Sequence, residues 1–384
     1  MMTLSVAVLG AGTLLDNLSR ILVFLVVLSV LVVLHELGHF IVARWNGVRV
    51  NDFALGFGPT LLKWTSPRSG TNYRLNAFPL GGYCAMQGED GKTSEAEQQR
   101  QFREERPTDG SDNFQSKTPL QRLAIVAAGP IANFIVAVAI LVFGAVAFGV
   151  PSDERINTII GPLMPGSPAV RAGLHVGDRV LAIDGAPVTS GRQMVDKIHS
   201  SAGVPLTLTY ERHGQTGQVT VTPMRTTVKG KTVGIIGFQT QAVYEHVDPV
   251  KAVTFGMQEF AGLLTANVAG LGNLVIHPKT AMSQVSGPIG MAHVSSEAQD
   301  LGPGPYLQLA AAISVALGIF NFLPIPALDG GRGIFILAEM LRGRPVDPEK
   351  EALVHVTGFA LLMVLMLFVA YHDIASIVTG SGAG

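Results

Sequence analysis

The sequence predicts a polytopic α-helical membrane protein with four transmembrane helices, a membrane-associated β-region and an inserted α+β domain. Hydrophobic residues make up 48% of the 384 positions and charged residues only 14%, and the mean hydropathy is +0.38. The apolar residues gather in four segments, each long enough to cross a bilayer, which takes about 20 residues in a helix. The formal net charge of -1 gives no sign of nucleic-acid binding, so no nucleic-acid partner is expected.

The four candidate spans lack Lys, Arg, Asp and Glu over most of their length, and the first one differs from the others near its end. It begins with the uncharged run Ile21–Leu34 and then carries His35, Glu36 and His39. The spans are expected at Ile21–Trp45, Leu123–Val150, Tyr306–Phe322 and Ala352–Tyr371.

The distribution of Lys and Arg predicts the orientation of these spans. Basic residues are dense between the first two spans and between the last two, and sparse beyond the outer ones. By the positive-inside rule, both termini should be periplasmic. The predicted segments are 1–45 (N-terminus and first span), 46–118 (cytoplasmic membrane-associated β-region and flexible loop), 119–150 (second span), 151–240 (inserted periplasmic domain), 241–304 (periplasmic amphipathic or linker segment), 305–326 (third span), 327–351 (cytoplasmic loop) and 352–384 (fourth span and tail).

Three segments between the spans have distinct patterns. Residues 49–86 alternate apolar and turn residues and predict short strands joined by glycine turns next to the membrane. Residues 87–117 are polar, and we expect a flexible segment without chemistry. The stretch Val250–Leu271 is compatible with a helix that lies along the outer membrane surface.

The inserted domain has a recognisable order of elements. Strand-like runs are followed by a helix that starts near Ser167 or Pro168 and by a second helix at Gly191–Ser200. This order resembles a bacterial PDZ domain, although an unrelated small β-rich domain is the alternative. PDZ domains take an extended peptide along a sheet edge. By that resemblance, a peptide or protein ligand would occupy a groove lined by Ile159, Ile160 and Gly161. The strand-like runs are Asn157–Ile160, Arg179–Ile183, Leu206–Tyr210 and Gln218–Thr222.

The strongest chemical signal is the HELGH sequence in the first span. On a helix, His35 and His39 share a face about 6 Å apart along the axis, which suits two ligands of one Zn²⁺. Glu36 lies beside them and can act as a general base toward water. Ionisable groups within a bilayer each cost about 3 kcal/mol or more unless they are compensated. The alternative is a pair of structural histidines hydrogen-bonded to neighbouring helices.

A catalytic zinc site usually has a third protein ligand. The third span ends at Pro324 and Pro326, which break the helix, and Asp329 follows in a glycine-rich turn. With the predicted orientation, Asp329 lies at the same depth as the two histidines. From this span alone, an ordinary turn aspartate is an equally good interpretation.

Three motifs together resemble the site-2 protease family of intramembrane zinc metalloproteases, and its bacterial regulator-of-sigma-E protease branch most closely. They are HELGH, GPIANF at Gly129–Phe134 and PALDGG at Pro326–Gly331. The resemblance covers nearly the whole chain, but this chain carries one PDZ-like domain where well-known members of the branch carry two in tandem.

The resemblance implies roles for particular residues. His35, His39 and Asp329 would bind one catalytic Zn²⁺, and Glu36 would be the catalytic base. Asn133 and Asn321 match polar positions near that site and are candidates for stabilising the oxyanion. Substrate handling is expected of the β-region, through Gly56, Phe57 and Gly58 and the segment Tyr73–Met86.

The expected function is hydrolysis of peptide bonds in or near the transmembrane segments of single-pass proteins in a bacterial inner membrane. The resemblance implies an anti-sigma factor, a signal-peptide remnant or another membrane segment as substrate, cut near the cytoplasmic side. Two alternatives remain open, a zinc-binding membrane transporter or sensor without proteolysis and a membrane scaffold that presents its PDZ-like domain.

Overall fold

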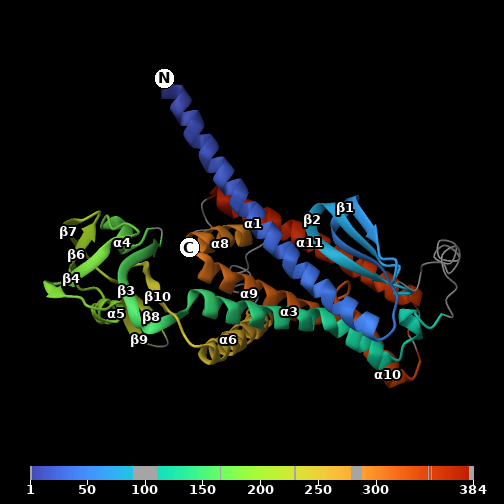
Figure 1. Cartoon of the computed structure of the whole chain (residues 1–384). Coiled ribbons are helices and arrows are strands. Elements are labelled where there is room, and N and C mark those ends of the chain that lie inside the picture. Colours follow the sequence, from blue (N-terminus) through green and yellow to red (C-terminus); the bar gives the residue numbers. More distant parts are fainter. Residues whose placement is uncertain are drawn as a thin grey trace. The chain divides into compact units, whose positions relative to one another are not determined.

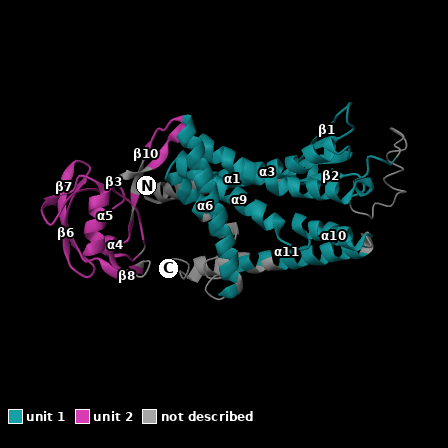
Figure 2. Ribbon diagram, turned by 90° about the horizontal axis from the view of Figure 1, so that it is seen from below, with its two compact units in different colours: residues 1–145, 249–378 teal, residues 146–248, 379–384 magenta. Residues whose placement is uncertain are grey.

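The protein is described from a computed structural model that covers residues 2–89, 110–164, 166–228, 231–277, 288–344, 346 and 348–379. The chain forms two compact units (Figure 2). The helical unit comprises Met1–Ala145 and Pro249–Val378, and the inserted unit comprises Val146–Asp248 and Thr379–Gly384.

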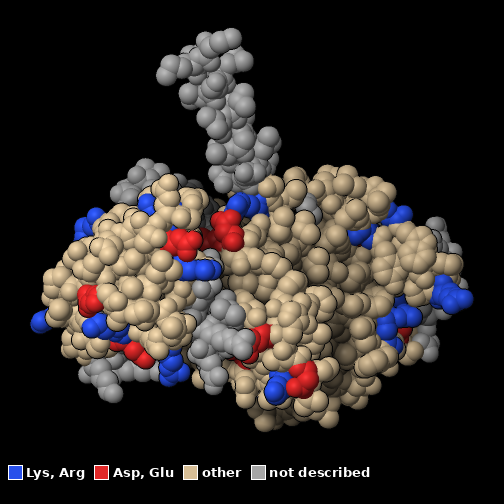
Figure 3. Space-filling view, turned by 60° about the vertical axis from the view of Figure 1, so that its left-hand side comes forward, with Lys and Arg blue, Asp and Glu red and all other residues tan. Residues whose placement is uncertain are grey.

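Long apolar helices build the helical unit (Figure 1). Among the described residues, three stretches are long and apolar enough to cross a membrane, namely Ser19–Trp45, Pro119–Phe148 and Pro303–Phe322. The fourth expected span lies in a further helix, α11. Most of the surface shown in Figure 3 carries neither Lys or Arg nor Asp or Glu, as expected of lipid-facing helices. The helices are α1 (Met2–Trp45), α3 (Pro119–Phe148), α6 (Pro249–Ile276), α8 (Pro288–Asp300), α9 (Pro303–Phe322), α10 (Asp329–Arg342) and α11 (Pro348–Thr379).

Two sequence expectations about these helices need adjustment. The first helix begins at Met2, well before Ile21, and runs through Gly10 and Gly12 without a break. The segment 327–351 is not a plain loop, because α10 occupies most of it. The helix expected at Val250–Leu271 is confirmed as part of α6.

The β-region is a hairpin of two long elements, β1 (Val50–Thr65) and β2 (Asn72–Met86), each of which bends back on itself. Residues 52–55 pair with both 82–85 and 72–75, and residues 60–65 pair with 72–76, so the expected short strands are present as paired segments within these two elements. The glycines interrupt the register inside two long strands: Gly56 and Gly58 have φ of +79° and +87°, and the pairing shifts around them. The hairpin packs against α1, mainly through β2 (Figure 1).

One apolar cluster joins the ends of α1 and α3 to the hairpin and α10. It contains Cys84 as a packed hydrophobe, and it also contains Phe114 from a short 3₁₀ helix, η1 (Phe114–Ser116). Phe114 is 2% exposed, which corrects the expectation that all of 87–117 is flexible; residues 90–109 of that segment lie outside the described residues. The other buried members are Ala43, Val48, Val50, Met86, Ile125, Val126 and Ile336.

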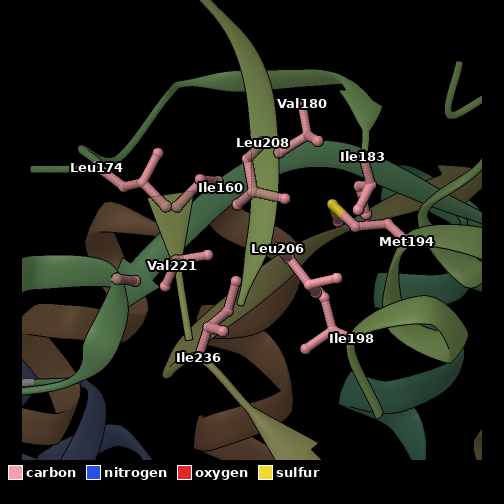
Figure 4. Close-up of a cluster of buried hydrophobic side chains, with 11 residues drawn as sticks. Ile160, Leu174, Val180, Ile183, Met194, Ile198, Leu206, Leu208, Val221 and Ile236 are labelled. Carbon is pink, nitrogen blue, oxygen red and sulfur yellow. The ribbon is translucent and has the colours of Figure 1, made fainter. Parts of the chain in front are cut away.

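The inserted unit is a sheet covered by two helices. Its strands run in the order β10-β3-β4-β6-β7, with β5 paired to β4 and a separate β8–β9 hairpin. Apolar side chains from the sheet and from α5 meet in one core around Ile160, Leu208 and Met194 (Figure 4). The elements are β3 (Val150–Leu163), α4 (Pro168–Arg171), β4 (Arg179–Ile183), β5 (Ala186–Pro187), α5 (Gly191–Ser200), β6 (Leu206–Arg212), β7 (Gln215–Val221), β8 (Met224–Val228), β9 (Lys231–Ile235) and β10 (Phe238–Glu245).

The sequence located most of these elements. Helix α5 has the expected bounds, and Ser167 caps α4 by accepting a hydrogen bond from the Val170 N–H. Strand β3 is longer than the expected Asn157–Ile160 because it pairs along most of its length with β10, which returns from far along the chain.

Candidate active site

Helix α1 brings His35 and His39 together one turn apart. Their Nε2 atoms are 3.2 Å from each other, and the two side chains are only 7% and 6% exposed. The HELGH spacing therefore places both imidazoles on one buried face, as expected of i and i+4 on a helix.

Glycines let α3 approach this face closely. A Cβ added to Gly38 would lie 2.3 Å from the Ala128 carbonyl oxygen, so only glycine allows the contact between α1 and α3. A Cβ on Gly129 would lie 2.2 Å from the His39 Nε2. The small residues of HELGH and GPIANF thus make room for the imidazoles between two helices.

Asp329 completes the group from a distant part of the chain. Its Oδ2 lies 3.1 Å from the His35 Nε2 and 3.2 Å from the His39 Nε2. It does not lie in a turn, as the sequence suggested, but is the first residue of α10. Gly330 and Gly331 permit this start, since a Cβ on either would overlap the carbonyl oxygens of Leu323 and Ile325, at 2.2 and 2.4 Å.

The hydrogen bonds behind the histidines fix their protonation. The His39 Nδ1 faces the Ile125 carbonyl oxygen at 2.8 Å, so Nδ1 donates, and in the neutral ring Nε2 presents a lone pair. That lone pair faces the Oδ2 of Asp329, which is also an acceptor. Two buried acceptors at this distance repel each other unless a metal ion or a proton lies between them.

The spacing of the three atoms fits zinc. Ligand atoms that lie about 2.0–2.1 Å from a tetrahedral Zn²⁺ are about 3.3 Å from one another. The three side-chain atoms here are separated by 3.1–3.2 Å. In the part of the chain that the structure describes, these three residues are the group of side chains that could hold a metal ion.

Asn133 lies behind His35 rather than in front of it. Its side-chain amide is 3.0 Å from the His35 Nδ1 and the residue is fully buried, while its Oδ1 has no hydrogen-bond partner. If the Asn133 amide is rotated by 180°, its Oδ1 accepts the proton on the His35 Nδ1. The lone pair of the His35 Nε2 then faces the proposed metal position. The Asn133 amide, which the sequence suggested as an oxyanion donor, is thus occupied by its contact with His35.

Glu36 lies on the side of α1 that faces the hairpin. Its carboxylate hydrogen-bonds with the backbone of Cys84 on β2, and a Cβ on Gly82 would lie 3.7 Å from its Cγ. The side chains of His39, Asp329 and Glu89 lie near it. The residue is partly buried, and its carboxylate is not one of the three ligand atoms that converge.

The other residues expected near the site are more scattered. The Asn321 amide donates to the Leu317 carbonyl of its own helix at 3.0 Å. In the hairpin, the Gly56 carbonyl accepts from Asn76 at 2.8 Å, and the half-exposed Phe57 ring stacks on Tyr83.

The predicted peptide groove in the inserted unit needs correction. Strand β3 lies between β10 and β4, so Ile159, Ile160 and Gly161 do not form a sheet edge. The Ile160 backbone is fully used, because its N–H donates to the Asp178 carbonyl and its carbonyl accepts from Gly177. The edge of the sheet beside β3 is β10 instead.

Contacts between the hairpin and α10 were not predicted from the sequence. Arg332, three residues after Asp329, forms an ion pair with Glu89 at the end of β2. The DGGR sequence could have indicated that Arg332 lies near the site, because Arg332 follows Asp329 by about one helical turn and shares its face.

Comparison with protein families matches residues 23–365 to the peptidase family M50. This chain belongs to peptidase family M50. A putative zinc metalloprotease of Agrobacterium fabrum is 35% identical over 92% of this chain and 95% of its own length. The zinc metalloprotease RasP of Geobacillus kaustophilus is 32% identical over 94% and 98%, and a probable protease, eep, of Enterococcus faecalis is 29% identical over 93% and 99%.

Among solved structures, the PDZ domain of the SdrC-like protein from Listeria monocytogenes is 27% identical, covering 24% of this chain and 90% of that chain, with a TM-score of 0.19. The M50 match and its relatives confirm the resemblance to site-2 proteases. The protein is a multi-pass membrane zinc metalloprotease of the site-2 type.

Proposed function

We propose that this M50 peptidase hydrolyses peptide bonds in or next to the transmembrane segments of single-pass membrane proteins. His35, His39 and Asp329 hold one Zn²⁺, and Glu36 is the catalytic base. The proposal rests above all on one observation: three ligand atoms separated by 3.1–3.2 Å converge beside a glutamate in the first apolar helix.

Each residue has a defined task in this mechanism. Bound Zn²⁺ lowers the pKa of a water molecule toward about 7 and polarises the scissile carbonyl. Glu36 takes the proton from the attacking water and later gives it to the leaving amine. Asn133 orients His35, and the Ile125 carbonyl orients His39 in the same way. Asn321 remains the candidate for stabilising the oxyanion.

The substrate helix must unwind before cleavage, because its carbonyls are held in intrahelical hydrogen bonds. We propose that the β1–β2 hairpin binds the unwound segment through its backbone and through exposed apolar side chains. Phe57, Trp64 and Phe78 are all more than half exposed. Gly56 and Gly58 allow the positive φ that bends β1, and the Phe78 ring packs over Gly58.

The proposed topology has four spans in a bacterial inner membrane, with both termini periplasmic and the metal site toward the cytoplasm. Support for the fourth span comes from α11, on which large apolar side chains are exposed along much of its length. These are Leu353, Val356, Phe359, Leu361, Val364 and Leu367. Labelling of single cysteines by a membrane-impermeant reagent, placed in 110–116 and 343–346, tests the topology, because both segments should be protected in intact cells.

The inserted unit is proposed to act as a periplasmic PDZ-like filter that admits substrates already shortened by another protease. Its peptide-binding edge would be β10, since β3 is enclosed on both sides. Removing the unit between residues 149 and 246 should then permit cleavage of full-length substrates that the intact protein rejects.

Cleavage of a panel of tagged single-pass membrane proteins by the purified chain in detergent tests the proposed activity. We expect Asp329→Ala to lose both zinc and cleavage, and chelation of the wild type to abolish cleavage until zinc is restored. A transporter or sensor would bind zinc without cutting any substrate, and a scaffold would cut nothing even when zinc is present.

A further inference from the structure

Helix α11 contacts the loop that precedes Asp329 through one partly buried hydrogen bond. The Ala327 N–H, two residues before Asp329, donates to the Nδ1 of His355 at 2.9 Å. The ring therefore carries its proton on Nε2, which lies 4.0 Å from the Glu351 Oε1 on the same helix.

The backbone at Ala327 is strained. Its φ is +77°, a left-handed conformation that residues other than glycine adopt at a cost in free energy. Such a conformation persists only where its surroundings impose it. The contact with His355 supplies such a constraint, because the hydrogen bond forms only when the Ala327 N–H points toward α11.

Packing around the loop is tight on the same side. A Cβ added to Gly358, one turn after His355, would lie 2.3 Å from the Pro326 Cβ. The His355 ring also packs against Phe335 of α10, with the ring centroids 5.7 Å apart. Helix α11 thus contacts both the loop before Asp329 and the helix after it.

We infer that His355 is a positioning residue that fixes the Ala327–Asp329 turn, and through it the place of the Asp329 carboxylate opposite His35 and His39. The inference rests on the proposed role of Asp329 as a zinc ligand. Groups that orient a metal ligand typically contribute about 10- to 100-fold to metal affinity. Helix α11 is then part of the metal site's framework rather than only a membrane anchor.

Three substitutions at His355 test this inference by zinc affinity, measured in detergent by competition with a chelator. The oxygen of His355→Asn can occupy the place of Nδ1, so this variant should bind zinc within about threefold of wild type. His355→Gln places its amide further out, and His355→Leu has no acceptor, so both should bind zinc about tenfold more weakly or worse. His199→Leu, at an exposed position of α5, is the matched control and should bind zinc normally.

A double variant adds a check on the mechanism. Glycine adopts positive φ without strain, so Ala327→Gly in the His355→Leu background should recover zinc affinity in part. Thermal unfolding of each variant separates loss of fold from loss of zinc. If His355→Leu does not fold, the comparison of His355→Asn with His355→Gln decides the test. Equal zinc affinity in the Asn, Gln and Leu variants overturns the inference, as does equal loss in Asn and Gln.

The two levels of the proposal fail in different ways. If Asp329→Ala keeps its zinc, the proposed ligand set is wrong. If Asp329→Ala loses zinc while His355→Gln and His355→Leu keep wild-type affinity, only the role of His355 is wrong.

Discussion

His39 turns the lone pair of its Nε2 toward the Asp329 Oδ2 at 3.2 Å, because its Nδ1 donates to the Ile125 carbonyl at 2.8 Å. Two acceptors that face each other in a buried site call for a cation. In the proposed zinc site, the metal would connect the first apolar helix to the start of α10, and the packing around them would determine the zinc affinity.

The close approach of α1 and α3 yields a first prediction. In Gly129→Ala the new methyl group would fall on the His39 Nε2, so the histidines must shift; we expect loss of zinc and a destabilisation of about 1–3 kcal/mol. Zinc content of the purified protein and its thermal midpoint measure both effects.

Gly144→Ala on the same helix is the matched control. Its Cβ would meet only the Leu307 side chain at 3.7 Å, an ordinary contact, so zinc should be retained. Normal zinc content in Gly129→Ala would show that the space between the helices is not what positions the histidines.

The exposed aromatic side chains of the hairpin yield a second prediction. Replacing Phe57 and Trp64 by alanine removes apolar surface that a bound substrate would bury, so kcat/KM should fall on the order of tenfold or more. Zinc content should not change, because neither residue touches the triad. Rates are measured with one purified single-pass substrate.

Trp45→Ala, at an exposed position at the end of α1, controls for general effects of removing a surface aromatic. Unchanged cleavage by the Phe57 and Trp64 variant would argue against substrate binding by the hairpin.

The inserted unit should lose stability in acid, which is a third prediction. Burial alone would raise the pKa of Asp178, but hydrogen bonds donated by Arg212 and by the His175 N–H lower that pKa below its ordinary value. The stabilisation is therefore complete above the unfolded pKa of about 3.9 and is lost as the pH falls through the lower folded value. Asp178→Asn should be less stable at neutral pH and should depend less on pH below about 4.

Hydrogen exchange of the β4 and β6 amides in the full chain, corrected for intrinsic rates, measures this stability. Asp184→Asn is the control, because its contact with Lys197 is solvent-exposed and should contribute little, and the asparagine oxygen can still accept the hydrogen bond from the Thr207 N–H. Equal acid sensitivity of wild type and Asp178→Asn would contradict the assignment.

Local patterns in the sequence were enough to predict the catalytic helix and much of the fold. The HELGH spacing placed His35 and His39 on one helix face, and uncharged runs identified the three spans that the structure supports. Asp329 was found because its depth followed from the orientation of the third span, although the helix it begins was not foreseen.

What sequence analysis missed depends on contacts between distant segments. The enclosure of β3 by β10 follows from pairing across the whole inserted unit, which no pattern near Ile160 reveals. The role of Gly129 depends on how closely α1 and α3 pack, and the contact of His355 with Ala327 depends on a strained turn. The position of Asn133 behind His35 is likewise a matter of tertiary geometry.

The most direct test of the mechanism compares Glu36→Gln with wild type, measuring cleavage of a single-pass substrate and bound zinc in the same purified samples. Glutamine cannot accept a proton from water, and Glu36 is not a member of the metal triad. The account predicts one zinc per chain in both proteins and a loss of cleavage of about 100-fold or more in Glu36→Gln. Cleavage by Glu36→Gln at the wild-type rate, with zinc bound, would contradict it.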